Sequence, residues 1–177
     1  MSKALIFDMD GTLTPATQDI SPDMMAELSK VRPAYKKYLV SGSDMEKIER
    51  QIPVDFLLSN FDKVFSCNGT RVWNCKLDMD DETHPVEPEL VHKISLLDHY
   101  SQADINHIVS YLLKLASESH TQFKTGTFIE WRESQINFSV VGRNCSLDQR
   151  EDYVRWDKKS SERKRIAEKL RNEFSGW

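Results

Sequence analysis

An apolar run near the N-terminus leads directly into a pair of aspartates. Residues 3–7 are typical of a buried parallel strand, and Asp8-Met9-Asp10-Gly11-Thr12 follows without a break. Two carboxylates one residue apart, at a strand end and before a glycine, suit Mg²⁺-assisted phosphoryl transfer, because one can attack phosphorus while the other handles the proton. We therefore expect Asp8 to be the nucleophile and Asp10 the general acid and base.

The same segment is expected to bind the metal. The Asp8 carboxylate and the Asp10 backbone carbonyl are the expected Mg²⁺ ligands, since this ion removes the repulsion between a carboxylate and a phosphoryl group. Gly11 allows a sharp turn that brings backbone amides near the phosphate, and Thr12 is expected to hydrogen-bond that turn. The alternative is a capped, solvated turn, but the strand, the motif and the following elements all agree with a catalytic site.

The composition is that of an ordinary globular protein. The 177 residues, 39% hydrophobic and 29% charged, suffice for one large domain or two small ones. The net charge of −4 argues against nucleic acid or an anionic membrane surface as the main partner. No apolar run approaches the ~20 residues of a membrane span, and residues 1–8, which lead directly into the expected strand, lack the layout expected of a secretory signal. Cys67, Cys75 and Cys145 form no CxxC pair, so we expect reduced thiols and a cytoplasmic location rather than a disulfide or zinc site.

Strands and helices alternate in the first part of the chain. The expected elements are a strand at 3–8, a helix from 22 to about 31, a strand at 38–40, a helix at 44–51, and a hairpin of strands at 64–67 and 71–76. Ser21 is the expected N-cap of the first helix, and Asn68-Gly69 is the turn signal of the hairpin. The strand–helix–strand order predicts a parallel sheet with a right-handed crossover.

An acidic segment with two prolines, residues 77–88, is expected to link two domains, with a boundary near residue 83. The expected elements beyond it are a helical stretch at 89–118 broken near Ser101, strands at 127–132 and 135–140, and helices at 147–156 and 161–174. The predicted fold class is therefore α/β, with a core at 1–83 and an α+β domain at 84–177.

Two serines at the end of the second predicted strand are candidate phosphate ligands. The hydroxyl groups of Ser41 and Ser43 can bind a phosphate oxygen and fix its orientation. The alternative is that Ser43 is simply the N-cap of the following helix.

Three arginines in the second part of the chain form another candidate site. Arg132 and Arg143 end or follow the two predicted strands, and Arg150 lies in the first turn of the next helix. Guanidinium groups bind phosphate through paired hydrogen bonds, so together they would suit a second phosphate held away from Asp8. From spacing alone, the better reading is surface ion pairs with Glu130, Glu133 and Asp148.

The chain resembles a known family at several of these segments. Residues 7–14 resemble the first motif of the haloacid dehalogenase superfamily, and residues 41–48 are similar to its "GGSDFEK" segment. Segments specific to eukaryotic-type phosphomannomutases are similar to residues 126–132, 141–146, 157–159 and 170–174. The resemblance covers nearly the whole chain, more loosely from 71 to 123.

The resemblance implies a Rossmann-like core with an inserted α/β cap, and dimers through that cap. It implies interconversion of mannose 6-phosphate and mannose 1-phosphate for GDP-mannose synthesis, with Mg²⁺ and a hexose 1,6-bisphosphate as activator or intermediate. It also implies Asp8 as nucleophile and Asp10 as acid and base. The implied substrate ligands are Ser41, Ser43, Asn68, Arg132, Arg143 and Arg150.

The chain also departs from the family pattern. Thr17 stands where the family usually has an arginine, and Cys67 where it has a glutamate. Family members continue beyond the position of Trp177, through a third-motif lysine and the acidic metal ligands of a fourth motif. The chain is thus expected to be a piece of a longer polypeptide, a shortened protein, or a form that works with another chain. A sugar-phosphate phosphatase and a non-catalytic homologue are the alternatives to a mutase.

Overall fold

The computed structural model describes residues 3–31, 34–75 and 87–176. They divide into a first unit, Met1–Asp98 with Arg132–Gln135, and a second unit, His99–Trp131 with Ile136–Trp177. The predicted boundary near residue 83 lies outside the described residues, as does most of the predicted linker.

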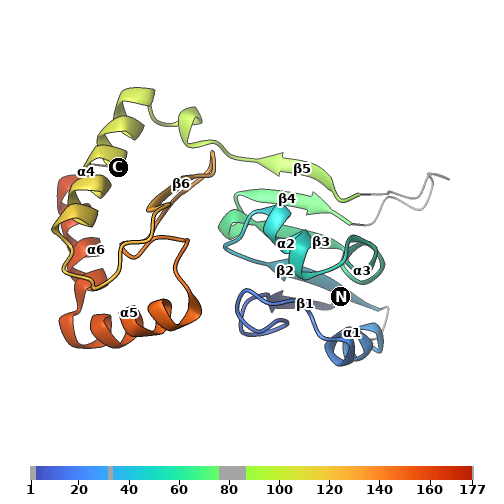
Figure 1. Cartoon of the computed structure of the whole chain (residues 1–177). Helices are drawn as coiled ribbons and strands as arrows, with labels where there is room; N and C mark the ends of the chain where they lie inside the picture. The colour runs from blue at the N-terminus through green and yellow to red at the C-terminus, as the bar shows by residue number, and fades with distance from the viewer. Residues whose placement is uncertain (1–2, 32–33, 76–86, 177) are drawn as a thin grey trace. The chain divides into compact units, whose positions relative to one another are not determined.

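A five-stranded sheet forms the first unit (Figure 1). Its strands, in spatial order, are β1 (Lys3–Asp8), β2 (Tyr35–Val40), β3 (Lys63–Ser66), β4 (Arg71–Asn74) and β5 (Glu89–Lys93). The first three strands are parallel, and β4 and β5 continue the sheet in antiparallel fashion. The predicted α/β class with a parallel sheet is confirmed, and so is the hairpin around Asn68-Gly69.

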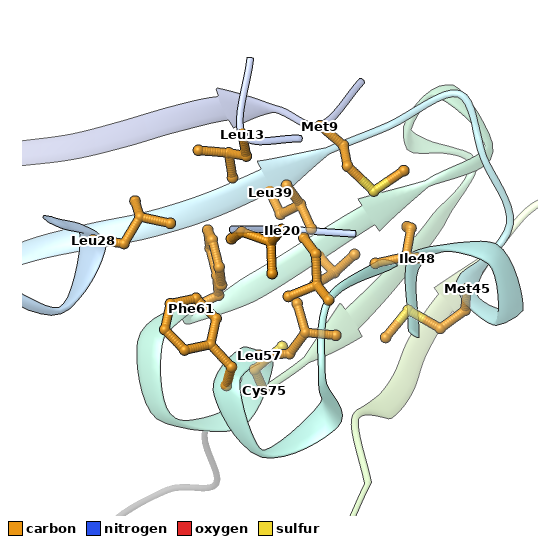
Figure 2. Close-up of a cluster of buried hydrophobic side chains, with 13 residues drawn as sticks. Met9, Leu13, Ile20, Leu28, Leu39, Met45, Ile48, Leu57, Phe61 and Cys75 are labelled. Carbon is orange, nitrogen blue, oxygen red and sulfur yellow. The ribbon is translucent and has the colours of Figure 1, made fainter. Parts of the chain in front are cut away.

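Three helices pack on the sheet of the first unit. They are α1 (Pro22–Ser29), α2 (Met45–Gln51) and α3 (Val54–Asn60). Figure 2 shows their apolar side chains gathered with those of the strands and of the turn after β1. Leu39, Ile48, Leu57, Phe61 and Val64 are fully buried in this cluster. Burial of each such side chain contributes about 1.5–3 kcal/mol, so this cluster holds the helices against the strands.

Local sequence explains where these helices begin. The Ser21 hydroxyl accepts a hydrogen bond from the Met24 amide at 3.2 Å, and Pro22 occupies the first helical position, as predicted. At α2 the cap is Asp44, which accepts from the Lys47 amide at 2.9 Å. The alternative that Ser43 caps this helix is therefore wrong, and its hydroxyl is available for another contact. The helix α3, which follows Pro53, was not among the predicted elements.

Two predictions about the sheet are wrong: the burial of β1 and the helical structure of residues 89–93. β1 was expected to be buried, but among the described strands it lies at the edge of the sheet, and Ile6, which alternates away from Phe7, is 69% exposed. Residues 89–93 were expected to begin a helical stretch, but they form β5 and pair with β4. Short apolar runs fit a helix or a strand equally well, and here the neighbouring edge decides.

The second unit combines a hairpin with three helices. Its elements are α4 (Gln102–Glu118), β6 (Ile129–Trp131), β7 (Ile136–Phe138), α5 (Leu147–Ser160) and α6 (Glu162–Glu173). The predicted hairpin and helices are confirmed, and the α-helix of the 89–118 stretch begins after Ser101. That serine and Ser146 each start a helix with a reciprocal capping box. The ring of Phe174 packs edge-on against Tyr111 and joins α6 to α4.

The cysteines and the helix lengths bear on two further questions, a disulfide or zinc site and a membrane span. Cys67 and Cys75 are buried, Cys145 is partly exposed, and no disulfide joins them in the described part of the chain. Among the described helices, none is both long and apolar enough to cross a lipid bilayer.

Candidate active site

The turn after β1 is built around one carbonyl group. Met9 is fully buried, and its carbonyl oxygen accepts hydrogen bonds from the amides of Thr12, Leu13 and Thr14 at 3.0–3.2 Å. Gly11 has φ +87°, a left-handed conformation that glycine adopts without strain, so the chain reverses there as expected. The Thr14 hydroxyl also donates to Met9, at 3.3 Å, so the side-chain bond expected of Thr12 is made two residues later.

Asp8 is the last residue of β1 and lies opposite Val40 in the parallel register. Its side chain is exposed, and within the described ranges it accepts no hydrogen bond. The carboxylate is therefore available to a ligand or a metal ion.

Asp10 is held by three hydrogen-bond donors. The Thr17 amide donates to Oδ1 at 2.9 Å, Gln51 Nε2 lies 3.3 Å from the same oxygen, and Lys47 Nζ lies 3.0 Å from Oδ2. Partial burial acts to raise the pKa of Asp10, but these hydrogen bonds and the charge of Lys47 outweigh it and lower the pKa below its ordinary value. The two aspartates thus differ: Asp8 is exposed and Asp10 is anchored.

The anchoring of Asp10 predicts a loss of stability in acid. A carboxyl whose pKa is lower in the folded state contributes fully above its unfolded pKa, and the contribution is lost as pH falls through the folded pKa. In Asp10→Asn, the free energy of unfolding should therefore fall less steeply between about pH 5 and pH 2 than in the wild type. Urea unfolding at a series of pH values measures both slopes, and parallel curves would contradict the assignment.

Ser41 and Ser43 lie in the loop between β2 and α2, and both are buried. The Ser41 hydroxyl accepts from the Ser43 amide at 3.1 Å, and the Ser43 hydroxyl lies 3.1 Å from Lys47 Nζ. Lys47 therefore bridges Ser43 to Asp10, which brings the loop after β2 next to the turn after β1. The arrangement combines one ammonium group, hydroxyl groups and an exposed carboxylate, which suits a bound phosphate.

Sequence reasoning missed Lys47 and Gln51. With Ser43 they are spaced four residues apart, which places them along one side of α2 and its N-terminal loop. This polar stripe on a short helix was a usable signal. Thr17 was identified only as a departure from the family pattern. Its backbone has φ 63°, and its amide donates a hydrogen bond to Asp10.

Arg132 and Asn68 lie at the same loop of the first unit. Arg132 Nη1 donates to the Gly42 carbonyl at 3.1 Å, and Nε lies 3.7 Å from Asp44 Oδ2. Asn68 donates to Gln135 Oε1 at 2.6 Å, and its own oxygen would lie 3.1 Å from a Cβ placed on Gly42. Both residues therefore surround the backbone between Ser41 and Asp44, and their contact with substrate stays a prediction.

Arg143 and Arg150 belong to the second unit. Arg143 Nε lies 3.4 Å from Glu130 Oε2, which is one of the ion pairs given as the alternative to phosphate binding. Arg150 is exposed on α5. Glu133, another expected ion-pair partner, pairs with Arg71 instead. Arg132 belongs to the first unit, and a common phosphate site of the three arginines stays a prediction.

The residues of the turn fit Mg²⁺ with few protein ligands. Among the described residues, no group of three or more His, Cys, Asp or Glu side chains gathers for a metal ion. Asp8 nevertheless offers an exposed carboxylate next to the Asp10 backbone. Mg²⁺ in phosphoryl-transfer sites is commonly held by one or two carboxylates, with water and substrate phosphate as the other ligands. That donor set suits Mg²⁺ better than a softer metal.

Comparisons with known proteins agree with the predicted resemblance. A family model described as eukaryotic phosphomannomutase matches residues 24–177. A probable phosphomannomutase of Caenorhabditis elegans is 36% identical over 176 residues, which cover 98% of this chain and 65% of that protein. Phosphomannomutase 1 of Homo sapiens is 34% identical over 172 residues, which cover 97% of this chain and 61% of that protein.

A solved structure supports the fold. The C-terminal domain of C. albicans trehalose-6-phosphate phosphatase matches with a TM-score of 0.55 at 16% identity, over 97% of this chain and 50% of that chain. The likeness concerns the fold alone. The chain spans slightly less than two thirds of the length of the relatives described above. With the family model matching most of its residues, the chain belongs to the eukaryotic phosphomannomutase family.

Proposed function

We propose that this protein interconverts mannose 6-phosphate and mannose 1-phosphate through a phosphoryl group held on Asp8. The observation that supports this most is the contrast between the two aspartates of the turn. Asp8 presents an exposed carboxylate, and Asp10 is fixed by three donors two residues away. This is the division of labour between a nucleophile and a proton carrier. Family membership supports the choice of mannose phosphates as substrates.

The proposed reaction has two half-steps that use the same residues. In the first, an Asp8 oxygen attacks a phosphorus of hexose 1,6-bisphosphate, the bond from phosphorus to the sugar oxygen breaks, and Asp10 protonates that oxygen. In the second, Asp10 takes the proton from a hydroxyl of the acceptor mannose phosphate, and that hydroxyl attacks the phosphoryl group on Asp8. Asp8 is free again, and the bisphosphate formed can donate its other phosphate.

The serine loop and the metal ion would support this transfer. Ser43 and Lys47 would bind oxygens of the phosphoryl group and hold it in line with Asp8. The Asp8 carboxylate and the Asp10 carbonyl would hold Mg²⁺, which when bound neutralises the negative charge that otherwise repels the nucleophile. Ser41 supports the loop by accepting from the Ser43 amide.

The arginines would bind the phosphate that is not transferred. We assign this role to Arg132, Arg143 and Arg150, whose guanidinium groups match phosphate geometry. The ion pair of Arg143 with Glu130 engages Nε at 3.4 Å, and a guanidinium group has five N–H donors in all. Phosphate binding therefore does not require that ion pair to break.

The test is a product assay. The protein is incubated with Mg²⁺, mannose 1-phosphate and a catalytic amount of glucose 1,6-bisphosphate, and the products are separated. We expect mannose 6-phosphate, formed only when the bisphosphate is present. Inorganic phosphate in its place would indicate a sugar-phosphate phosphatase, and no product would indicate a non-catalytic homologue. Either result would contradict the proposal.

The proposed partner is thus a small-molecule sugar phosphate, and the proposed location is the cytoplasm. The three cysteines, which form no CxxC pair, support that location, because reduced cysteines are typical of cytosolic proteins. Dimerisation through the cap stays a prediction of the family resemblance.

A further inference from the structure

One glutamine at the end of α2 holds the segment that contains the active-site turn. Gln51 is 4% exposed, and its Nε2 lies 2.7 Å from the carbonyl oxygen of Gln18. The same nitrogen lies 3.3 Å from both Asp10 Oδ1 and the Thr14 hydroxyl. The Gln51 backbone carbonyl accepts from the Ile20 amide at 2.8 Å. A single buried residue therefore contacts this segment at four points.

The hydrogen bonds that fix the side-chain amide of Gln51 are made by its nitrogen and not by its oxygen. It has two N–H donors and three acceptors, so the short bond to Gln18 uses one hydrogen while Asp10 and Thr14 share the other. Gln51 Oε1 is buried and has no hydrogen-bond partner among the described residues. A buried acceptor without a partner costs free energy. In Gln51 this unfavourable acceptor belongs to the same amide group whose nitrogen donates to Asp10.

The donors around Asp10 treat its two oxygens differently. Oδ1 accepts hydrogen bonds from the Thr17 backbone amide, which lies on the same loop, and from the buried side chain of Gln51. Oδ2 faces Lys47, which also contacts the Ser43 hydroxyl at the proposed phosphate position. The terminal torsion of an aspartate is broad, so a carboxylate without such donors would rotate and exchange its oxygens.

We infer that Gln51 is a positioning residue for Asp10: it fixes Oδ1, so that Oδ2, the oxygen that faces Lys47, is the one that exchanges the proton with the sugar oxygen. The inference rests on the proposed function, since it assigns the oxygen that serves the proposed reaction. In the proposed reaction Gln51 acts through Asp10, which it contacts directly, rather than by binding the sugar. Loss of its N–H donors should thus slow the proton transfer without weakening substrate binding.

Kinetics of Gln51→Met test this role. Methionine has a similar length and volume but no N–H donor, so kcat should fall about ten- to a hundredfold while KM for the sugar phosphate stays unchanged. Gln18→Met is the matched control, because the Gln18 side chain is exposed and only its backbone carbonyl contacts Gln51. In an Asp10→Ala background, Gln51→Met should cause no further loss. A wild-type kcat in Gln51→Met, or a further loss in the Asp10→Ala background, would overturn the inference.

A second measurement does not depend on turnover. A double-mutant cycle of Asp10→Ala and Gln51→Met, followed by urea unfolding, should show a coupling of about fivefold or more in the unfolding equilibrium constant. No coupling would overturn the inference. If the coupling is clear but the protein turns over no mannose phosphate, the proposed function is contradicted. The interaction between Gln51 and Asp10 is then still supported. If Gln51→Met fails to fold, Gln51→Leu also removes the N–H donors without adding a charge beside Asp10, and the kinetic expectation is the same.

Discussion

Replacing Asp8 by asparagine is expected to lower the turnover of mannose phosphates by more than about a thousandfold. A carboxamide is a poor nucleophile toward phosphorus, and the other carboxylate of the turn, Asp10, is held by three donors and cannot replace it. The variant should fold like the wild type, because asparagine has nearly the same shape and the Asp8 side chain accepts no hydrogen bond from the described residues. Steady-state turnover and urea unfolding measure both expectations.

The matched control for this variant is Asp19→Asn. Asp19 is an exposed aspartate in the same connection between β1 and α1, outside the proposed site, and its replacement makes the same change in charge. We expect turnover close to that of the wild type. Undiminished turnover in Asp8→Asn would show that Asp8 is not the nucleophile, and an equal loss in both variants would point to a general effect of charge.

Gly142→Ala is expected to destabilise the second unit by about 3–5 kcal/mol. Gly142 has φ +93°, and a Cβ at this position would lie 2.1 Å from the carbonyl oxygen of Gly126. Neither backbone can move away easily, because the Thr125 amide donates to the Val141 carbonyl at 2.8 Å beside the contact. The residue therefore combines an unfavourable backbone conformation with a clash against the main chain. Urea unfolding of the variant measures the loss.

Gly69→Ala separates the two causes. Gly69 has φ +87°, but a Cβ at this position would have no neighbour within 4 Å. Only the backbone strain applies there, so we expect a loss of about 1–2 kcal/mol. Equal losses in the two variants would contradict the close approach between Gly142 and Gly126.

Helices and strands that are specified by neighbouring residues were mostly predicted correctly from the sequence. The Ser21-Pro22 start of α1 and the strand at 3–8 follow from residues next to each other in the sequence. The exposure of Ile6 did not follow, because burial depends on the neighbours of β1 in the sheet. β5 was missed for the same reason: its pairing with β4 joins segments separated by the predicted linker.

The candidate site shows the same division. Asp8, Asp10 and Ser43 were identified because a short motif contains each of them. Lys47 and Gln51 were not, since their contacts with Asp10 span 37 and 41 residues of sequence and depend on how α2 lies beside the turn. The four-residue spacing from Ser43 was an unused signal that these polar groups lie along one side of α2 and the loop before it. The arginines stay predictions, since Arg132 lies in one unit and the other two in the second.

The central claim is that Asp8 accepts the phosphoryl group. The most direct test incubates the protein with Mg²⁺ and glucose 1,6-bisphosphate labelled in its phosphates, quenches the mixture in acid and reduces it with borohydride. Reduction converts an aspartyl phosphate to homoserine, and peptide mass spectrometry locates the change. We predict homoserine at position 8 in the wild type and none in Asp8→Asn. A stable label on another residue, or turnover without modification of Asp8, would contradict the account.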